Sequence, residues 1–313
     1  MKKIIVLLLV LFATKSYSLE VLTYNVQGLN PFSKESKFRQ KYVCDKLKNS
    51  SYDIVLLQEA WLKKDRNNLK KCGFPYSVDL DKRVGLFRNL IRKKIQRPLI
   101  FLVGYLLKAL VPDKIGYDTG LMILSRHPIL NTYKKHYSIN GSQWHLRDGE
   151  MAVSKGVIGA TINHHEFGEI FVATTHLVSE YIDKSYVRQR LTQLKELKSF
   201  IDQHSNNNPV ILGGDFNISP PSKSKIRYLD SDTLWGKVKE IFYEYKEYSF
   251  DFDRLTTYPG KSLEYDEGFI DHIFATNEFR ASEGHVKFID QISYKNKKLP
   301  ASDHYAVSTK FEY

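Results

Sequence analysis

Short runs of apolar residues recur along the chain, each bounded by glycine, proline or asparagine and rich in valine and isoleucine. Runs of this length and composition are typical of buried β-strands rather than of helices. We expect strands at 19–26, 53–60, 119–125, 156–162, 169–177, 209–216, 268–276 and 304–313. The stretch 156–177 predicts a hairpin that turns through 163–168.

Two segments between these runs have helical spacing instead. Segment 33–51 places Phe38, Tyr42 and Leu47 near one face. Segment 184–204 repeats apolar residues at intervals of three and four, namely Val187, Leu191, Leu194, Leu197 and Ile201. Both patterns indicate amphipathic helices that cover a sheet. Strands interrupted by such helices, without an internal repeat or a linker, predict a single α/β domain with mixed sheets.

The N-terminus has the pattern of a secretory signal peptide. Lys2 and Lys3 precede an apolar stretch, 4–13, and residues 16–18 form a small-x-small sequence. We therefore expect residues 1–18 to be removed, the domain to span 19–313, and the protein to be secreted.

Charge and cysteine content refine this picture only in part. Loss of the three lysines of the signal peptide lowers the formal net charge from +12 to +9. A basic surface suits anionic partners, either nucleic acid or a membrane. Cys44 and Cys72 are the two cysteines of the chain. In an oxidising compartment they form one disulfide or remain two unpaired thiols, and the pattern does not choose between these. It does not indicate an oligomeric state either.

Polar residues that suit metal and proton chemistry stand at the ends of the predicted strands: Asn25, Glu59, His176, Asp215, Asn217, Asp271, Asp303 and His304. Singly, each has a structural explanation, such as a turn after a strand. Together they offer carboxylates and amides, which hard cations prefer, and imidazoles that move protons near neutral pH. The set predicts metal-assisted hydrolysis of a phosphate ester.

Seven motifs in order, LTYN, LLQEAW, TGLMILSRHPI, TTHL, GGDFN, IDHIF and SDHY, resemble those of the endonuclease/exonuclease/phosphatase superfamily. The resemblance covers residues 22–307. It implies a deoxyribonuclease-like four-layer α/β sandwich, in which helices flank two mixed β-sheets. It also implies Mg²⁺, or Mn²⁺ in its place, as the cofactor.

The same resemblance assigns roles to the strand-end residues. It makes Glu59 the principal metal ligand, with Asn25 beside it, and has Asp303 help to hold the metal or the neighbouring histidine. It assigns the other residues to the attacking water and to the phosphate. Asp215 and Asn217 orient the attacking water and bind the phosphate, His304 paired with Asp271 is the general base, and His176 contacts a nonbridging phosphate oxygen.

The stretch RDGEMAVSKG at 147–156 resembles the neutral, magnesium-dependent sphingomyelinases within this superfamily. In those enzymes an acid and the lysine at Lys155 form a pair beside the active site, and the acid aligns with Glu150, with Asp148 nearby. An exposed turn before a strand is the structural alternative for Lys155. Two positions depart from the family pattern: His272 replaces a tyrosine and Val178 replaces a glutamine. A strand histidine beside an aspartate favours a hydrogen-bonded structural role for His272.

We therefore expect a secreted phosphodiesterase that hydrolyses sphingomyelin to ceramide and phosphocholine. The main alternative is a secreted magnesium-dependent nuclease, so nucleic acid remains a weaker candidate partner. An inositol-phosphate phosphatase comes third, because the chain lacks a basic, tryptophan-containing signature around Asp271. A lipid-binding or pore-forming protein on a decayed enzyme scaffold, without catalysis, is the non-enzymatic alternative.

An unusual insertion, at about 86–113, separates two of the motifs. Within 88–112, five basic residues lead into Pro98, and nine residues without a charge follow at 99–107. The run is too short to span a bilayer, which needs about 20 apolar residues. A buried core helix and an interfacial membrane anchor are the two interpretations, and the basic residues favour the anchor. The predicted membrane contacts are Leu99, Phe101, Leu102, Val103 and Leu106, which predicts a peripheral protein at the membrane surface.

Overall fold

The computed structural model describes residues 18–28, 35–80, 118–140, 150, 153–179, 184–221, 231–248, 257 and 268–312. Residues 1–17 of the predicted signal peptide and the predicted membrane-contact segment 88–112 lie outside this part. None of the helices it describes combines the length and the apolarity needed to cross a membrane.

The first of two large sheets has six strands in the order β11-β14-β1-β2-β4-β3. These strands are β1 (Ser18–Asn25), β2 (Ile54–Gln58), β3 (Tyr76–Val78), β4 (Met122–Ser125), β11 (Arg280–Lys287) and β14 (Ala306–Glu312). Strands β1 and β2 run parallel, whereas the other pairs are antiparallel. The carboxyl ends of β1 and β2, at Asn25 and beside Glu59, therefore lie at the same edge of the sheet.

The second sheet has the order β5-β6-β7-β8-β10-β9. Its strands are β5 (Ile129–His136), β6 (Gly156–His164), β7 (Gly168–His176), β8 (Val210–Asp215), β9 (Tyr245–Glu247) and β10 (Asp271–Thr276). The predicted hairpin is confirmed, because β6 and β7 pair antiparallel from Gly156–His176 to His164–Gly168. Strand β8 runs parallel to β7, so His176 and Asp215 end neighbouring strands at one edge.

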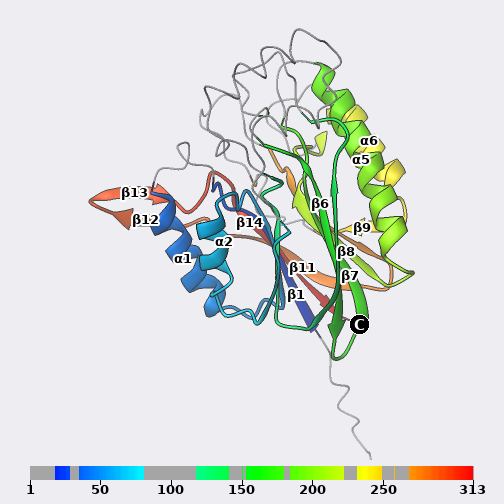
Figure 1. Cartoon of the computed structure of the whole chain (residues 1–313). Helices are drawn as coiled ribbons and strands as arrows, with labels where there is room; N and C mark the ends of the chain where they lie inside the picture. Colours follow the sequence, from blue (N-terminus) through cyan, green and yellow to red (C-terminus); the bar gives the residue numbers. More distant parts are fainter. Residues whose placement is uncertain are drawn as a thin grey trace, which may run out of the picture.

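Helices cover the outer face of each sheet, which completes four layers (Figure 1). Helices α1 (Ser36–Lys48) and α2 (Lys63–Leu69) lie beside the first sheet, and α5 (Lys184–His204) and α6 (Ser231–Ile241) beside the second. Three apolar clusters separate the layers. One lies between the sheets and includes Ile54, another between the second sheet and α5, and the third between the first sheet and α1. The predicted sandwich of two mixed sheets flanked by helices is confirmed.

A small hairpin of β12 (Gln291–Tyr294) and β13 (Lys297–Pro300) extends beyond α1, away from the sandwich (Figure 1). The two cysteines form a disulfide, so Cys44 of α1 is tied to Cys72, which follows α2. Of the two alternatives for these cysteines, the bonded one is confirmed. Strand β5 escaped prediction because it is a sheet edge with mostly exposed or half-buried polar residues, which lack a strand's apolar alternation.

Candidate active site

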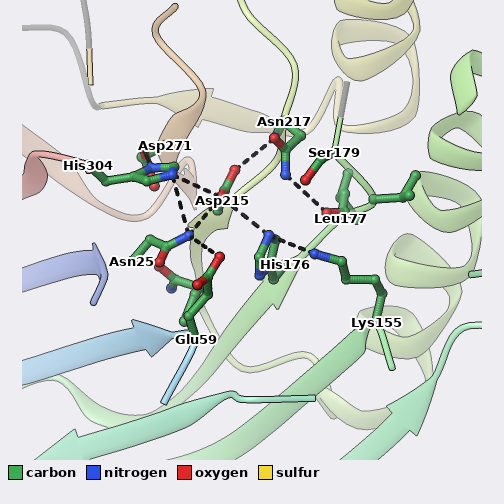
Figure 2. Close-up of polar contacts among 12 residues, drawn as sticks. Asn25, Glu59, Lys155, His176, Leu177, Ser179, Asp215, Asn217, Asp271 and His304 are labelled. Carbon is green, nitrogen blue, oxygen red and sulfur yellow. Dashed lines mark hydrogen bonds and ion pairs between the residues drawn. The ribbon is translucent and has the colours of Figure 1, made fainter. Parts of the chain in front are cut away.

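Asp215, at the end of β8, is the residue on which the predicted site converges (Figure 2). Its Oδ1 accepts the backbone N–H of Asn217 at 3.0 Å, which forms the turn that ends the strand. Its Oδ2 accepts a hydrogen bond from Asn25 Nδ2 at 3.0 Å and lies 3.4 Å from His176 Nε2 and 3.7 Å from His304 Nε2. One oxygen thus builds local structure, while the other joins side chains from three separate parts of the chain.

Asn25 connects the two sheets at this edge. Its Nδ2 donates to Glu59 Oε1 at 3.2 Å as well as to Asp215, and lies 3.4 Å from His304 Nε2. Its Oδ1 accepts the backbone N–H of Gln27 at 3.0 Å, which fixes the orientation of the amide. Asn25 stands beside Glu59 as predicted, and its amide nitrogen bridges the two carboxylates.

His304 and Asp271 form the predicted pair, with 2.8 Å between His304 Nδ1 and Asp271 Oδ2. Asp271 starts β10 directly opposite Asp215 in the ladder, because β10 and β8 are antiparallel. Burial disfavours a charged imidazole, but the carboxylates of Asp271 and Asp215 outweigh it and raise the pKa of His304 to about 10. His304 Nδ1 therefore donates to Asp271, and its Nε2 faces Asp215.

Lys155 carries the positive charge beside His176. Its Nζ donates to His176 Nε2 at 2.8 Å, and the two side chains are almost completely buried. Burial, followed by the charges of Lys155 and His304, lowers the pKa of His176 well below its usual value. The neutral ring carries its proton on Nδ1, a buried atom that meets no hydrogen-bond partner among the described residues. The buried cation beside His176 is therefore Lys155, and the phosphate contact of His176 stays a prediction.

Glu150 lies next to this lysine, with its Oε1 3.6 Å from Lys155 Nζ. The same oxygen accepts the backbone N–H of Ser179 at 3.3 Å. Lys155 is 2% exposed and Glu150 3%, so the exposed-turn alternative for Lys155 is wrong. The pairing of an acid with Lys155 is confirmed for Glu150, whereas Asp148 lies outside the described residues.

Glu59 and its neighbours have the chemistry of a divalent-cation site. Burial, then the charge of Asp303, raises the pKa of Glu59, and burial, with a smaller contribution from Asp271, also raises that of Asp215. Carboxylates here outnumber the cations Lys155 and His304, so the site carries excess negative charge in hard oxygen donors. Mg²⁺ and Mn²⁺ prefer such donors, and the residues present therefore fit the predicted cofactor. A second acidic set, Asp215 and Asp271 with His304, has ligand atoms within 4.8 Å of one another.

Asn217 occupies the left-handed backbone region, with φ of 51°, just beyond β8. Its Nδ2 donates to the carbonyl of Leu177 at 3.1 Å, which ties this turn to the end of β7 (Figure 2). Its phosphate-binding role stays a prediction.

His272 has the structural role that the sequence favoured. It is fully buried, with Nδ1 2.5 Å from Glu247 Oε1 and Nε2 2.8 Å from the carbonyl of Ile218. Because neighbouring strand residues point to opposite faces, His272 faces away from the side on which Asp271 meets His304.

Three histidines, to which the sequence assigned no function, gather at the opposite end of the β6–β7 hairpin. The ligand atoms of His127, His164 and His165 lie within 4.8 Å of one another. However, His164 Nδ1 accepts the backbone N–H groups of Glu166 and Phe167 at 3.2 and 3.1 Å, so a neutral His164 carries its proton on Nε2. A protonated nitrogen is not a metal ligand, and this group is better explained as the cap of the hairpin turn.

Polar residues to which the sequence assigned no chemical role hold the backbone around Lys155. Asn140 Oδ1 accepts the backbone N–H of Lys155 at 3.0 Å. Gln193, from α5, accepts the N–H of Val178 at 2.9 Å and donates to the carbonyl of Ile139 at 2.8 Å. The signal that could have found Gln193 is its place on the apolar face of the predicted amphipathic helix, where a glutamine is unusual.

A family model and curated relatives match most of this chain. The model of the Endonuclease/Exonuclease/phosphatase family matches residues 22–304. The inositol phosphosphingolipids phospholipase C of Schizosaccharomyces pombe is 29% identical over 214 residues, which are 66% of this chain and 43% of that protein. Sphingomyelin phosphodiesterase 2 of Rattus norvegicus is 27% identical over 248 residues, 78% of this chain and 50% of that protein. The chain thus spans about half the length of these curated relatives.

Solved structures share the fold. The crystal structure of SmcL superposes with a TM-score of 0.65 at 17% identity and covers 95% of this chain and 99% of that chain. A beta toxin variant from Staphylococcus aureus with bound magnesium ions gives a TM-score of 0.61 at 15% identity, with 94% of this chain and 99% of that chain covered.

Proposed function

We propose that this chain, which belongs to the Endonuclease/Exonuclease/phosphatase family, is a metal-dependent phosphodiesterase that hydrolyses sphingomyelin to ceramide and phosphocholine. The observation that carries the proposal is the convergence on Asp215 Oδ2 of Asn25, His176 and His304. A carboxylate, an imidazole held by a second carboxylate and a buried lysine together suit attack by water on an anionic phosphodiester.

His304 is the group that would remove the proton of the attacking water. Its Nδ1–H is held by Asp271, so Nε2 is the nitrogen that exchanges protons. In the chain alone, Asp271 and Asp215 keep this nitrogen protonated at neutral pH, so it becomes a base only when the charge of Asp215 is offset. A Mg²⁺ or Mn²⁺ ion held by Glu59, with Asn25 and Asp303 nearby, would offset carboxylate charge and support the leaving oxygen.

Two other groups would act on the phosphate. Lys155 places a cation at the buried edge of the site, and His176 turns its Nδ1–H away from Lys155. A positive charge in so enclosed a position stabilises the charge that develops on phosphoryl oxygens more strongly than a solvated lysine does. Asp215 and Asn217 would hold the water and a phosphate oxygen.

The choice of a sphingolipid rests on the Glu150–Lys155 pair and on the names of the relatives. Sphingomyelin and inositol phosphosphingolipids share the phosphodiester to ceramide and differ in the head group. We further propose that the protein is secreted and reaches its substrate as a peripheral protein at the membrane surface, with segment 88–112 as the contact. The support for these two points is the sequence pattern alone, since 1–17 and 88–112 lie outside the described residues.

The experiment is hydrolysis by the purified chain lacking residues 1–18. Sphingomyelin vesicles, inositol phosphosphingolipid vesicles and supercoiled DNA are each incubated with Mg²⁺ or with EDTA, and phosphocholine, ceramide and DNA nicking are measured. We expect release of phosphocholine and ceramide that requires Mg²⁺. Nicking of DNA without phosphocholine release would replace the proposal by the nuclease alternative. Hydrolysis of the inositol phosphosphingolipid alone would mean that the protein recognises the inositol-phosphate head group instead of phosphocholine.

Variants separate catalysis from binding. Glu59→Gln and His304→Asn should each lower the rate by at least ~100-fold, in line with the contributions of a metal ligand and a general base. Glu169→Gln and His165→Asn are matched controls, because both residues are exposed and lie at the far end of the β6–β7 hairpin. If wild type binds vesicles but releases no product from any of the three substrates, the non-enzymatic alternative holds. Site variants that retain a measurable wild-type rate would instead refute the roles proposed for Glu59 and His304.

A further inference from the structure

The backbone at Glu59 is held in an unusual conformation. Glu59 directly follows β2 and has a φ of 59°, in the left-handed region that residues with a side chain rarely adopt. Its carbonyl accepts the N–H groups of Gly28 and Trp61 at 3.1 and 2.8 Å, and the N–H of Ala60 donates to the carbonyl of Gly120 at 2.8 Å. Such a conformation persists when the surroundings over-determine it.

Arg66, from α2, holds the two residues that follow Glu59. Its Nη1 donates to the carbonyl of Ala60 at 3.0 Å and to that of Trp61 at 2.6 Å. The side chain is 6% exposed, so its guanidinium meets little water. Because the guanidinium is planar and rigid, its contact with two successive carbonyls fixes where this turn lies relative to α2.

Asp79, just beyond β3, holds the guanidinium in turn. Asp79 Oδ1 lies 2.7 Å from Arg66 Nε, and its Oδ2 lies 3.2 Å from Lys70 Nζ. The Asp79 side chain is 8% exposed. Arg66 thus links the carboxyl ends of two strands of the first sheet. It contacts the turn that follows β2 and carries Glu59, and it pairs with Asp79, which follows β3.

We propose that Arg66, held by Asp79, is a positioning residue that sets the affinity of Glu59 for its divalent cation. The inference rests on the metal role proposed for Glu59 and deepens it. Arg66 hydrogen-bonds the carbonyls of Ala60 and Trp61 and not the Glu59 carboxylate. Its effect on cation binding is therefore to fix the position of that carboxylate. Residues that orient metal ligands typically contribute 10- to 100-fold in metal affinity.

The test is the dissociation constant for Mg²⁺, and for Mn²⁺ as a second probe, measured by titration calorimetry on the purified chain. Arg66→Lys keeps the charge but cannot hold two carbonyls and Asp79 at once, and should weaken cation binding by at least ~10-fold. Asp79→Asn should act in the same direction and, being nearly isosteric, guards against loss of folding in the arginine variant. At saturating Mg²⁺ the kcat of both variants should stay within about 3-fold of wild type, because the proton-transfer groups are unchanged.

Arg126→Lys is the matched control. Arg126 also holds carbonyls, those of Tyr52, Ser50 and Gly73, but does so near the other end of β2. The Arg126→Lys variant should lose about as much stability as Arg66→Lys does, while its dissociation constant for Mg²⁺ stays within about 2-fold of wild type. The proposal is overturned if Arg66→Lys and Asp79→Asn bind Mg²⁺ as wild type does, or if Arg126→Lys weakens binding equally. Failure of the proposed metal role has its own signature, equal binding by wild type and Glu59→Gln, and would overturn this inference as well.

Discussion

His164 should make the stability of the β6–β7 hairpin depend on pH. The ring is 1% exposed, and its Nδ1 accepts two backbone N–H groups at the turn. Burial, together with the neighbouring rings of His127 and His165, lowers the pKa of His164 from 6.5 to about 4, and Asp53 opposes this only in part. Protonation would turn Nδ1 from an acceptor into a donor that faces two other donors.

The magnitude follows from linkage. The unfolded chain binds this proton more tightly than the folded protein does. The contribution of neutral His164 to the free energy of unfolding is therefore fully present above pH 6.5 and is lost as the pH drops from 6.5 toward 4. Each pKa unit corresponds to about 1.4 kcal/mol, so the loss reaches about 2 kcal/mol at pH 5. Asn at this position can accept the same two N–H groups without titrating, so His164→Asn should remove the dependence.

Urea denaturation of wild type and His164→Asn at pH 7.5 and pH 5 is the assay. Groups outside this histidine cluster titrate alike in both proteins, so the difference between their unfolding free energies reports His164 together with its interaction with His127 and His165. From pH 7.5 to pH 5 the wild type should lose about 2 kcal/mol more unfolding free energy than His164→Asn does. His165→Asn removes only the third-ranked cause of the shift, after burial and His127, and should keep most of the wild-type pH dependence. A difference between wild type and His164→Asn that is the same at both pH values would refute the reasoning.

Three further predictions concern the site and its support. Lys155→Met should lower kcat for sphingomyelin at saturating Mg²⁺ by about 100-fold, because a buried cation beside the phosphate is lost; steady-state kinetics measures this. Replacing both Cys44 and Cys72 with serine opens a cross-link between residues 28 apart and should lower the unfolding free energy by about 3 kcal/mol in urea, with Mg²⁺ affinity unchanged. Gly120→Ala places a Cβ 2.6 Å from the Trp61 ring at a φ of 67°, and should cost about 2–3 kcal/mol in the same assay.

Much of the sandwich was predictable because its buried strands are continuous apolar runs. The runs that became β1, β2, β7 and β8 carry their polar residues at the carboxyl end, and parallel pairing brings those ends together within each sheet. Edge strands gave no such signal. Among the described strands β11 pairs with β14 alone, and its sequence RASEGHVK lacks an apolar run.

Within the site, the sequence indicated which residues meet but not their charge states. A histidine at a strand end suggests a proton carrier, but burial, followed by the charges of Lys155 and His304, lowers the pKa of His176 well below its usual value. Arg66 and Asp79 carry no signal in the sequence, since a charged residue in the polar segment KKDRNNL, or one that follows a short strand, is ordinarily exposed. Their burial depends on how α2 packs, which one-dimensional patterns do not encode.

Hydrolysis of sphingomyelin vesicles in ¹⁸O-labelled water, by wild type and Asp215→Asn with Mg²⁺, tests the central claim most directly. If the Asp215-centred site directs water to phosphorus, wild type places one labelled oxygen in phosphocholine and none in ceramide. Asp215→Asn should release phosphocholine at least ~100-fold more slowly, because the oxygen that joins Asn25, His176 and His304 loses its charge. Label in ceramide, or an undiminished rate in the variant, would contradict the account.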